Sequence, residues 1–321
     1  MRRLMTGAIA AGMLVAAAVA DVQVDKRIPY YTPTQGVSGS LKSVGSDTMN
    51  NIMASWFEAY QKFYPGVQTE VEGKGSSTAP PALIEGAAQF GPMSRAMKSS
   101  EVDAFEKAFG YKPTLLRTGI DALAVYVHKD CPLDEISIED LTRVFSVAGP
   151  DMTWGDLGVT DAAYRNRPVQ LYGRNSASGT YGYFKEVALQ KNDYKPTVKE
   201  QPGSSAVVQG VANDRFGMGY SGLGYMTADV KALKVAMEEG DEPFAPNAEN
   251  ASSGDYPIAR FLYVYVNKDP NQQLDPLRRE FIKMIFSQQG QEVMLKQGYF
   301  PVSAAIARED LMKVGVEWTG G

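Results

Sequence analysis

Apolar residues recur along the chain with the two periods that are typical of helices and of strands. The clearest helix follows Asp47: apolar side chains at positions 49, 52, 53, 56, 57 and 60 form one stripe, with Ser46 or Asp47 as the expected N-cap. Apolar or alternating segments predict strands at 41–44, 67–72, 90–93, 120–128, 169–172, 217–219 and 261–267. The segments between them predict helices at 79–86, 100–109, 138–145, 179–189, 204–213 and 276–289, and a loop at 238–257. Strands that alternate with helices indicate an α/β fold with a largely parallel sheet.

The first twenty residues have the pattern of an export signal. Arg2 and Arg3 precede an apolar run over 8–18, and a small-residue cleavage site stands just before Asp21. The run is shorter than the roughly 20 residues that a transmembrane helix needs. We therefore predict a signal peptide over 1–20 and a periplasmic or secreted mature protein that starts at Asp21. Loss of the two arginines changes the net charge from −5 to −7.

The composition excludes several classes of function. The chain of 321 residues is 44% hydrophobic and has one His and one Cys, so it can form a sizeable core but no Cys/His zinc cluster or internal disulfide framework. Its 37 acidic against 32 basic residues argue against nucleic-acid binding. His128 follows an apolar strand and is expected to be a surface or packing residue. Cys131 is expected to be a buried thiol, with intermolecular pairing as the alternative.

Three turns of the same kind lead into predicted helices, and each is rich in small hydroxyl residues. They contain Ser46, Asp47 and Thr48; Ser76, Ser77 and Thr78; and Ser178, Gly179 and Thr180. Helix N-termini expose unpaired N–H groups, and Ser and Thr hydroxyls add further donors, so converging turns of this kind can bind a small oxyanion. The alternative for each turn is an ordinary helix cap.

Two arginines strengthen the oxyanion hypothesis. Arg174 lies four residues before Ser178, and Arg95 follows Ser94 at the end of a predicted strand. The planar guanidinium suits bidentate contact with an oxyanion. The alternative for each arginine is a surface salt bridge.

With these residues in place, the chain resembles the phosphate-binding proteins of bacterial ABC phosphate importers, the PstS family. The resemblance covers about 41–303 and rests on blocks in the family's order: VGSDTM (44–49), GKGSST (73–78), FGPMSRAM (90–97), GIDALAVYVHKD (119–130), EDLTRVFS (139–146) with TWGDLG (153–158), GRNSASGTYGYF (173–184), FGMGYSGLGYM (216–226), YPIARFLYVYVNK (256–268) and QGYFPVS (297–303).

The resemblance implies a type II periplasmic binding fold, in which two α/β lobes are joined by two crossing strands. The expected division is an N-terminal arm over 21–37, lobe one over 38–119 plus 258–321, and lobe two over 120–257. The family's ligand would lie between the lobes, against Thr48, the Met49 amide, Ser76, Ser77, Ser94 and Arg95 from lobe one and Arg174, Ser178, Gly179 and Thr180 from lobe two. The implied partners are inorganic phosphate and an ABC permease. The chain is expected to be a monomer that performs no catalysis and uses no cofactor or metal.

One position departs from the family. Many members place an Asp after the strand that corresponds to 90–93, and this carboxylate accepts the proton of phosphate and repels unprotonated sulfate. The segment here is PMSRAM, without an Asp. We hypothesise that Asp47 takes the acceptor role; the alternative is that it only caps its helix.

Other functions stay open at this stage. The same scaffold could hold sulfate, molybdate or tungstate, or act as a secreted phosphate scavenger without a transporter, and the N-terminal arm could bind a partner protein. A phosphate-ester hydrolase would need a base beside Ser178. The segment 217–222 matches the dinucleotide pattern G-x-G-x-x-G, but no amphipathic helix is expected after it, as that pattern requires.

Overall fold

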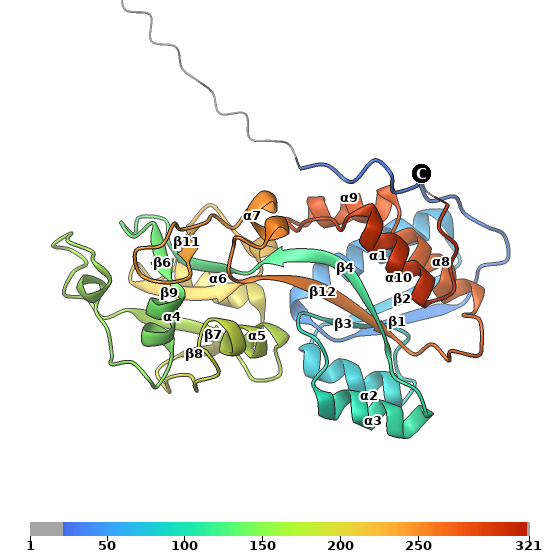
Figure 1. Cartoon of the computed structure of the whole chain (residues 1–321), viewed down its shortest axis with the longest axis horizontal. Helices are drawn as coiled ribbons and strands as arrows, with labels where there is room; N and C mark the ends of the chain where they lie inside the picture. Colours follow the sequence, from blue (N-terminus) through green and yellow to red (C-terminus); the bar gives the residue numbers. More distant parts are fainter. Residues whose placement is uncertain (1–21, 320–321) are drawn as a thin grey trace, which may run out of the picture.

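Two long strands, β4 (Thr114–Ala122) and β12 (Ala259–Val266), pair antiparallel and connect two lobes (Figure 1). The computed structural model describes residues 22–319, so the predicted signal peptide lies outside the described residues. Beyond the paired strands each lobe has its own hydrophobic core, one with Trp56 and Phe281 and the other with Trp154 and Tyr220. The mixed α/β content and the two-lobe form agree with the fold predicted from the sequence.

Lobe one contains chain from both sides of lobe two. Its elements are β1 (Ser40–Val44), η1 (Asp47–Met49), α1 (Asn50–Phe63), β2 (Gln68–Glu72), η2 (Ser76–Thr78), α2 (Ala79–Ile84), β3 (Gly91–Met93), α3 (Ser99–Phe109), α8 (Pro276–Ile285), α9 (Gln288–Lys296) and α10 (Ala304–Lys313). The predicted stripe of α1 is buried, and Trp56 Nε1 donates to the Gly290 carbonyl at 2.8 Å. Because buried Trp side chains carry much apolar area, Trp56→Ala is expected to cost about 3–5 kcal/mol of stability.

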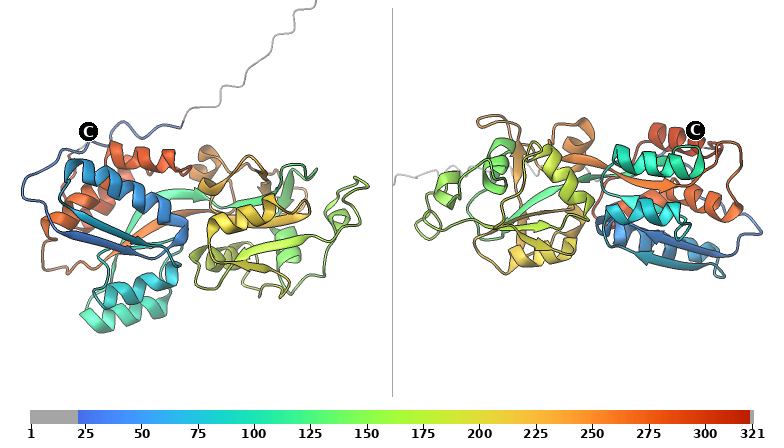
Figure 2. Two further views of the ribbon diagram at one scale, coloured as in Figure 1. Left: turned by 180° about the vertical axis from the view of Figure 1, so that it is seen from behind. Right: turned by 90° about the horizontal axis from the view of Figure 1, so that it is seen from below.

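Lobe two is built on a sheet with the strand order β10-β5-β9-β7-β8 in the described part of the chain. Figure 2 shows the two lobes side by side from behind and from below. Its elements are β5 (Ala124–His128), β6 (Glu135–Ser137), α4 (Ile138–Phe145), η3 (Trp154–Leu157), β7 (Gln170–Arg174), α5 (Gly179–Val187), β8 (Lys199–Gln201), α6 (Ser204–Ala212), β9 (Gly217–Ser221), η4 (Leu223–Tyr225), β10 (Val230–Ala232), β11 (Lys234–Ala236) and α7 (Ala248–Ser253). The stacked rings of Phe184 and Tyr220, 3.9 Å between centroids, fix α5 against β9.

Three sequence predictions about the fold are wrong in detail. The sheets are mixed, because β12 pairs antiparallel with β3 and β4, and β5 pairs antiparallel with β9. The predicted strand over 120–128 is divided, since β4 ends at Ala122 and β5 begins at Ala124. The predicted loop over 238–257 contains α7, which Asn247 caps by accepting from the Asn250 amide. Alternation of apolar residues marks a strand but does not record the direction of its neighbour.

The N-terminal arm lies along lobe one. Ile28 and Tyr31 are buried, and the Tyr31 hydroxyl is 2.6 Å from the Tyr64 hydroxyl and donates to Glu280 Oε2 at 3.1 Å. The backbone N–H of Gln288 donates to the Pro29 carbonyl at 2.9 Å. The arm is therefore part of the packing of lobe one.

Candidate functional site

The three hydroxyl-rich turns meet where the two lobes contact each other. Ser77 donates to the Ala177 carbonyl through both its Oγ, at 2.9 Å, and its backbone N–H, at 3.2 Å. Gly75 has a φ of +121°, and a Cβ on it would lie 2.5 Å from the Ala177 carbonyl oxygen. Only glycine fits both this backbone conformation and this approach. The turns from positions 75–77 and 176–180 thus close directly on one another.

Three serines form a buried hydroxyl cluster on the face of lobe one. Ser46 Oγ donates to Ser94 Oγ at 3.0 Å, Ser76 Oγ lies 3.3 Å from Ser94 Oγ, and the Ser94 amide donates to Ser76 Oγ at 3.0 Å. Each of the three side chains is at most 2% exposed. We define Ser46, Ser76 and Ser94 as the serine cluster.

The expected cap at the start of α1 is absent within the described residues. Neither Ser46 nor Asp47 makes a side-chain cap, and the first turn is the short 3₁₀ helix η1, in which the Met49 amide donates to the Ser46 carbonyl at 3.2 Å. The hydroxyl of Ser46 belongs to the serine cluster, and the carboxylate of Asp47 contacts lobe two. Neither side chain is therefore available to cap α1, and only that of Asp47 reaches lobe two.

Asp47 links the face of lobe one to lobe two. Its Oδ2 accepts from the Ser204 amide at 2.7 Å and lies 3.2 Å from Arg174 Nη1. Ser204 is the first residue of α6, which has no side-chain cap of its own from Gly203. The carboxylate thus satisfies one of the free N–H groups at this helix N-terminus, where a negative charge is favoured.

Arg174 is a buried cation of lobe two, with a side chain that is 1% exposed. Its Nη1 donates to Ser204 Oγ at 2.6 Å, while Nε, also buried, has no hydrogen-bond partner in the described part of the chain. Burial lowers the pKa of the guanidinium, and the charge of Asp47 acts in the opposite direction. A guanidinium stays protonated even so, so Arg174 carries a positive charge with an unused donor.

The third turn brings α5 against the serine cluster. Ser178 caps α5, since its Oγ accepts from the amides of Thr180 and Tyr181 at 3.1 and 3.3 Å. A Cβ on Gly179 would lie 2.2 Å from Ser76 Oγ and 2.7 Å from Ser94 Oγ. Thr180 Oγ1 lies 2.8 Å from Thr48 Oγ1, so hydroxyls of the two lobes pair directly.

Arg95, which the sequence predicts as a ligand residue, pairs with an acidic side chain of lobe one in this structure. Its guanidinium forms two bonds of 2.7 Å with the carboxylate of Glu101 and donates to the Ala96 carbonyl at 2.9 Å. Burial alone would raise the pKa of Glu101, but the bonds from Arg95 and from the Lys98 amide outweigh it and lower the pKa. Arg95 is thus paired within lobe one, beside the start of α3, as its salt-bridge alternative predicts.

Sequence reasoning missed three polar residues of this region. Ser204 follows Gly203 in a fourth turn of the same composition, which could have been found by the same pattern. Asp121 and Arg260 lie opposite each other on β4 and β12 and form a buried ion pair, with Arg260 Nη2 2.8 Å from Asp121 Oδ2. A charged residue flanked by apolar residues, as in GIDALAV (119–125) and IARFLYV (258–264), is the signal that could have pointed to them.

The remaining chemical candidates lie outside this cluster. His128 is the last residue of β5, and its Nδ1 accepts from the Asp130 amide at 3.2 Å. Cys131 is a buried free thiol whose pKa is raised by burial. The G-x-G-x-x-G match falls on β9 and is followed by η4, three residues of 3₁₀ helix, so the helix that a dinucleotide site needs is not formed there.

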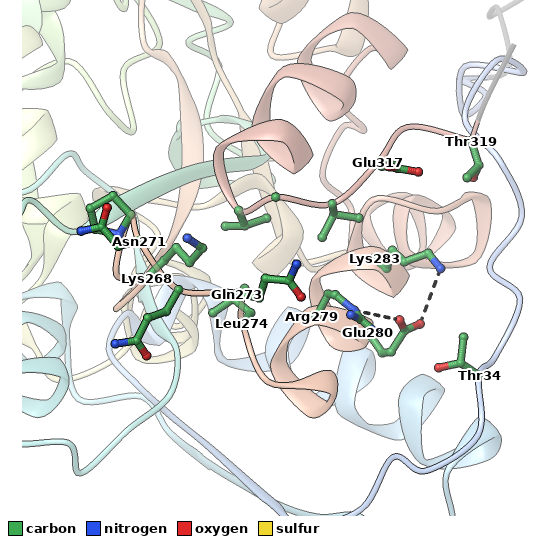
Figure 3. A pocket seen from close by; sticks show the side chains of 15 residues that line it. Thr34, Lys268, Asn271, Gln273, Leu274, Arg279, Glu280, Lys283, Glu317 and Thr319 are labelled. Carbon is green, nitrogen blue, oxygen red and sulfur yellow. Dashed lines mark hydrogen bonds and ion pairs between the residues drawn. The ribbon is translucent and has the colours of Figure 1, made fainter.

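Residues 22–319 contain no group of three or more His, Cys, Asp or Glu side chains placed to hold a metal ion. Within the same residues no helix has the length and apolar character to cross a membrane. A surface pocket of about 580 Å³ lies at the far side of lobe one, against the arm and the C-terminal segment (Figure 3). Three of its charged groups pair with one another, because Arg279 and Lys283 flank the carboxylate of Glu280 at 3.4 and 3.6 Å.

Two α/β lobes, joined by paired strands and with polar groups of both lobes meeting between them, define a two-lobe solute-binding protein. The chain belongs to the PBP superfamily, whose family model matches residues 32–289. Within it the chain belongs to the PstS phosphate-binding family. It is 49% identical to the phosphate-binding protein PstS of Pseudomonas aeruginosa (strain PAO1), over 98% of this chain and 99% of that one.

More distant relatives agree with this assignment. The phosphate-binding protein PstS of Bacillus subtilis (strain 168) is 27% identical over 92% of each chain. A crystal structure of a phosphate transporter substrate-binding protein from Clostridium perfringens, with bound phosphate, has a TM-score of 0.70 at 23% identity and covers 82% of this chain and all of that one. These are binding proteins, not enzymes. At this identity the structural likeness shows the fold.

Proposed function

We propose that this chain captures inorganic phosphate between its lobes and delivers it to an ABC permease. One observation supports the proposal most strongly. Buried polar groups gather where the lobes contact each other: the serine cluster, the Thr48–Thr180 hydroxyl pair and the guanidinium of Arg174. Hydroxyls and a guanidinium are donors that match the oxygens of a tetrahedral anion. Membership of the PstS family supports phosphate as that anion.

The proposed ligand residues come from both lobes. Lobe one supplies Ser46, Asp47, Thr48, Met49, Ser76, Ser77 and Ser94, and lobe two supplies Arg174, Ser178, Gly179 and Thr180. Arg95 is left out of this set, because its guanidinium is bound to Glu101. The expected lobe boundaries, 38–119 plus 258–321 and 120–257, complete the proposal.

Asp47 favours phosphate over sulfate, molybdate and tungstate as the ligand. Phosphate carries a proton at neutral pH and needs an acceptor, whereas an ionised carboxylate repels an anion without a proton. Asp47 is the carboxylate that touches both Arg174 and the first residue of α6. We propose that it accepts the proton of bound phosphate, the role that an Asp absent from the segment 90–97 has elsewhere in the family.

Binding follows from closure of the lobes around the anion. Closure removes water, and each hydrogen bond and charge then counts for more than it does in solvent. A ligand that contacts both lobes binds the closed form better and so shifts the population toward it. X-ray scattering of the mature chain should show smaller dimensions with phosphate than without, and identical dimensions would argue against closure.

Delivery to a permease requires export. The predicted signal peptide over 1–20 supports a periplasmic location, and N-terminal sequencing of the exported protein should begin at Asp21. The family resemblance favours a monomer, which sedimentation analysis can measure.

The function is tested by the anion that the protein retains. The mature chain should be purified without added phosphate and its bound anion identified by mass and by phosphate assay, followed by competition with sulfate, molybdate and tungstate. Retained phosphate that none of these displaces at equal concentration is the expected result. Tight binding of another oxyanion would support the rival ligand, and turnover of a phosphate ester would support the hydrolase.

A further inference from the structure

The strands that join the lobes carry a buried ion pair beside the proposed ligand site. The register of β4 and β12 sets Arg260 opposite Asp121, and their side chains are 2% and 0% exposed. Arg260 Nε and Nη2 donate to Asp121 Oδ2 at 3.1 and 2.8 Å, while Asp121 Oδ1 accepts from the Leu223 amide at 3.1 Å. The guanidinium is thus held in one place with its charge compensated.

The other donors of this guanidinium contact both faces of the cleft. Nη1 donates to the Ser94 carbonyl of lobe one at 2.8 Å, and Nη2 donates to Thr180 Oγ1 of lobe two at 2.9 Å. The plane of Arg260 also lies over the ring of Tyr183, 5.2 Å from its centroid. One fixed side chain therefore contacts a member of the serine cluster and a member of the hydroxyl pair.

The contact with Arg260 commits one lone pair of the Thr180 hydroxyl. Arginine has only donors, so Thr180 Oγ1 must accept from Arg260 and point its own hydrogen elsewhere. Thr48 Oγ1, 2.8 Å away, is within reach of that hydrogen. If Thr180 donates to Thr48, the hydrogen of Thr48 in turn is free for a further acceptor. Without the donor Arg260 beside it, the Thr180 hydroxyl could accept from Thr48 as readily as it donates to it.

We infer that Arg260, held by Asp121, is a positioning residue that makes Thr180 the donor to Thr48 and so directs the hydrogen of Thr48 toward the bound anion. The inference rests on the proposed function. It gives the proposed site two parts: Thr48 donates to an unprotonated oxygen of phosphate, and Asp47 receives the proton. Arg260 acts through Thr180 and does not itself touch the anion.

A mutant cycle tests this inference with inorganic phosphate as the titrant. Because removing Arg260 alone would leave the charge of Asp121 buried without a partner, the pair is replaced together as Asp121→Leu with Arg260→Met. This paired variant and Thr180→Val are each expected to weaken phosphate binding about tenfold, the worth of one hydrogen bond. The variant that combines these changes is expected to bind phosphate about tenfold more weakly than the wild type. A loss of about a hundredfold is not expected, because both changes remove the same oriented hydroxyl.

Two control variants separate positioning from a general effect on the strands. Thr180→Ser keeps a hydroxyl, so it should bind phosphate with nearly the affinity of the wild type. When the paired variant is added to Thr180→Ser, affinity should fall about tenfold, as it does in the wild type. Thr118→Val removes a buried hydroxyl that donates to the Leu262 carbonyl on the same strands at 3.0 Å. It should leave affinity unchanged, and its effect should be independent of the paired variant.

The outcomes are distinguishable from failure of the proposed function. If the wild type does not bind phosphate, the function is wrong. If the wild type binds but the paired variant keeps full affinity, or the two losses multiply to about a hundredfold, only the role of Arg260 is overturned. Arg260→Lys keeps the buried charge and supplies the same cycle with Thr180→Val if thermal melting shows that the paired variant is unfolded.

Discussion

The two lobes hold the polar groups of their contact in different ways. On lobe one, the serine cluster consists of neutral groups that bond to one another, so each hydroxyl has neighbours of the same kind. On lobe two, Arg174 is a buried cation whose Nε has no hydrogen-bond partner among the described residues. We therefore expect Arg174 of lobe two to balance the charge of an anion, because the charge of Arg260 is compensated by Asp121. Lobe one supplies many weak donors and one carboxylate acceptor, Asp47. We expect single changes in lobe two to cost more affinity than single hydroxyl losses in lobe one.

The largest effect is expected where the two faces touch. Gly179→Val would place a side chain within 2.2 Å of Ser76 Oγ and hold the lobes apart. Overpacking of this kind costs up to about 3 kcal/mol, so phosphate affinity should fall roughly a hundredfold. Calorimetric titration of each variant with phosphate measures this loss of affinity. Gly182→Ala is the control, because its Cβ would meet Arg95 Cδ at an ordinary 3.4 Å, and equal losses in both variants would refute the closed contact.

The two arginines predicted from the sequence should differ sharply. Arg174→Ala removes the buried cation and is expected to cost about 1.5–3 kcal/mol of binding free energy, as for hydrogen bonds to charged groups. Arg95→Ala, matched in type, should leave phosphate affinity nearly unchanged, because its guanidinium is bound to Glu101. The reverse order of effects would place the binding charge on lobe one.

Asp47→Asn tests whether the acceptor lies on lobe one. Loss of the carboxylate should weaken phosphate binding about tenfold and narrow the preference for phosphate over sulfate, since the acceptor for the proton is lost. Titration with phosphate and then with sulfate gives the ratio of the two affinities. Asp193→Asn makes the same charge change on the surface of lobe two, where Asp193 is 78% exposed and pairs with Lys185. Unchanged selectivity in Asp47→Asn would leave Asp47 without this role.

The smallest effect concerns the pair that holds Arg95. The pKa of Glu101 lies below its ordinary value of 4.5 in the folded protein, so its ionised form adds stability that is present above about pH 4.5 and lost as the pH falls through the folded pKa. Urea unfolding of wild type and Glu101→Gln should differ at pH 7, with the wild type more stable, and converge in acid. A constant difference at all pH values would contradict the pairing.

Much of the architecture could be predicted from the sequence because it depends on local patterns. The stripe of α1 and the hydroxyl-rich turns at Ser76 and Ser178 are properties of neighbouring residues, and the structure has helices at each. The pairing of Asp47 with Ser204, 157 residues apart, depends on how the lobes meet, which no local pattern records. The antiparallel sense of β12 was missed for the same reason.

The roles of the arginines show most clearly what the sequence alone does not predict. Arg95 and Arg174 both stand at strand ends before hydroxyl-rich segments, so the sequence treats them alike. Their difference arises from one residue, Glu101, which the first turn of α3 places against Arg95. Arg260 was missed because its position in an apolar strand predicts only burial, and its partner Asp121 lies on a strand far away in the sequence.

The central claim, that an anion is bound between unequal faces of a closing cleft, is tested most directly by one titration series. The mature chain and Arg174→Ala are titrated with inorganic phosphate and then with sulfate in a calorimeter. We predict that the wild type binds a single phosphate and prefers it to sulfate, and that Arg174→Ala weakens phosphate binding by about 10- to 100-fold. Absence of phosphate binding in the wild type, or equal affinity in the two proteins, would contradict the account.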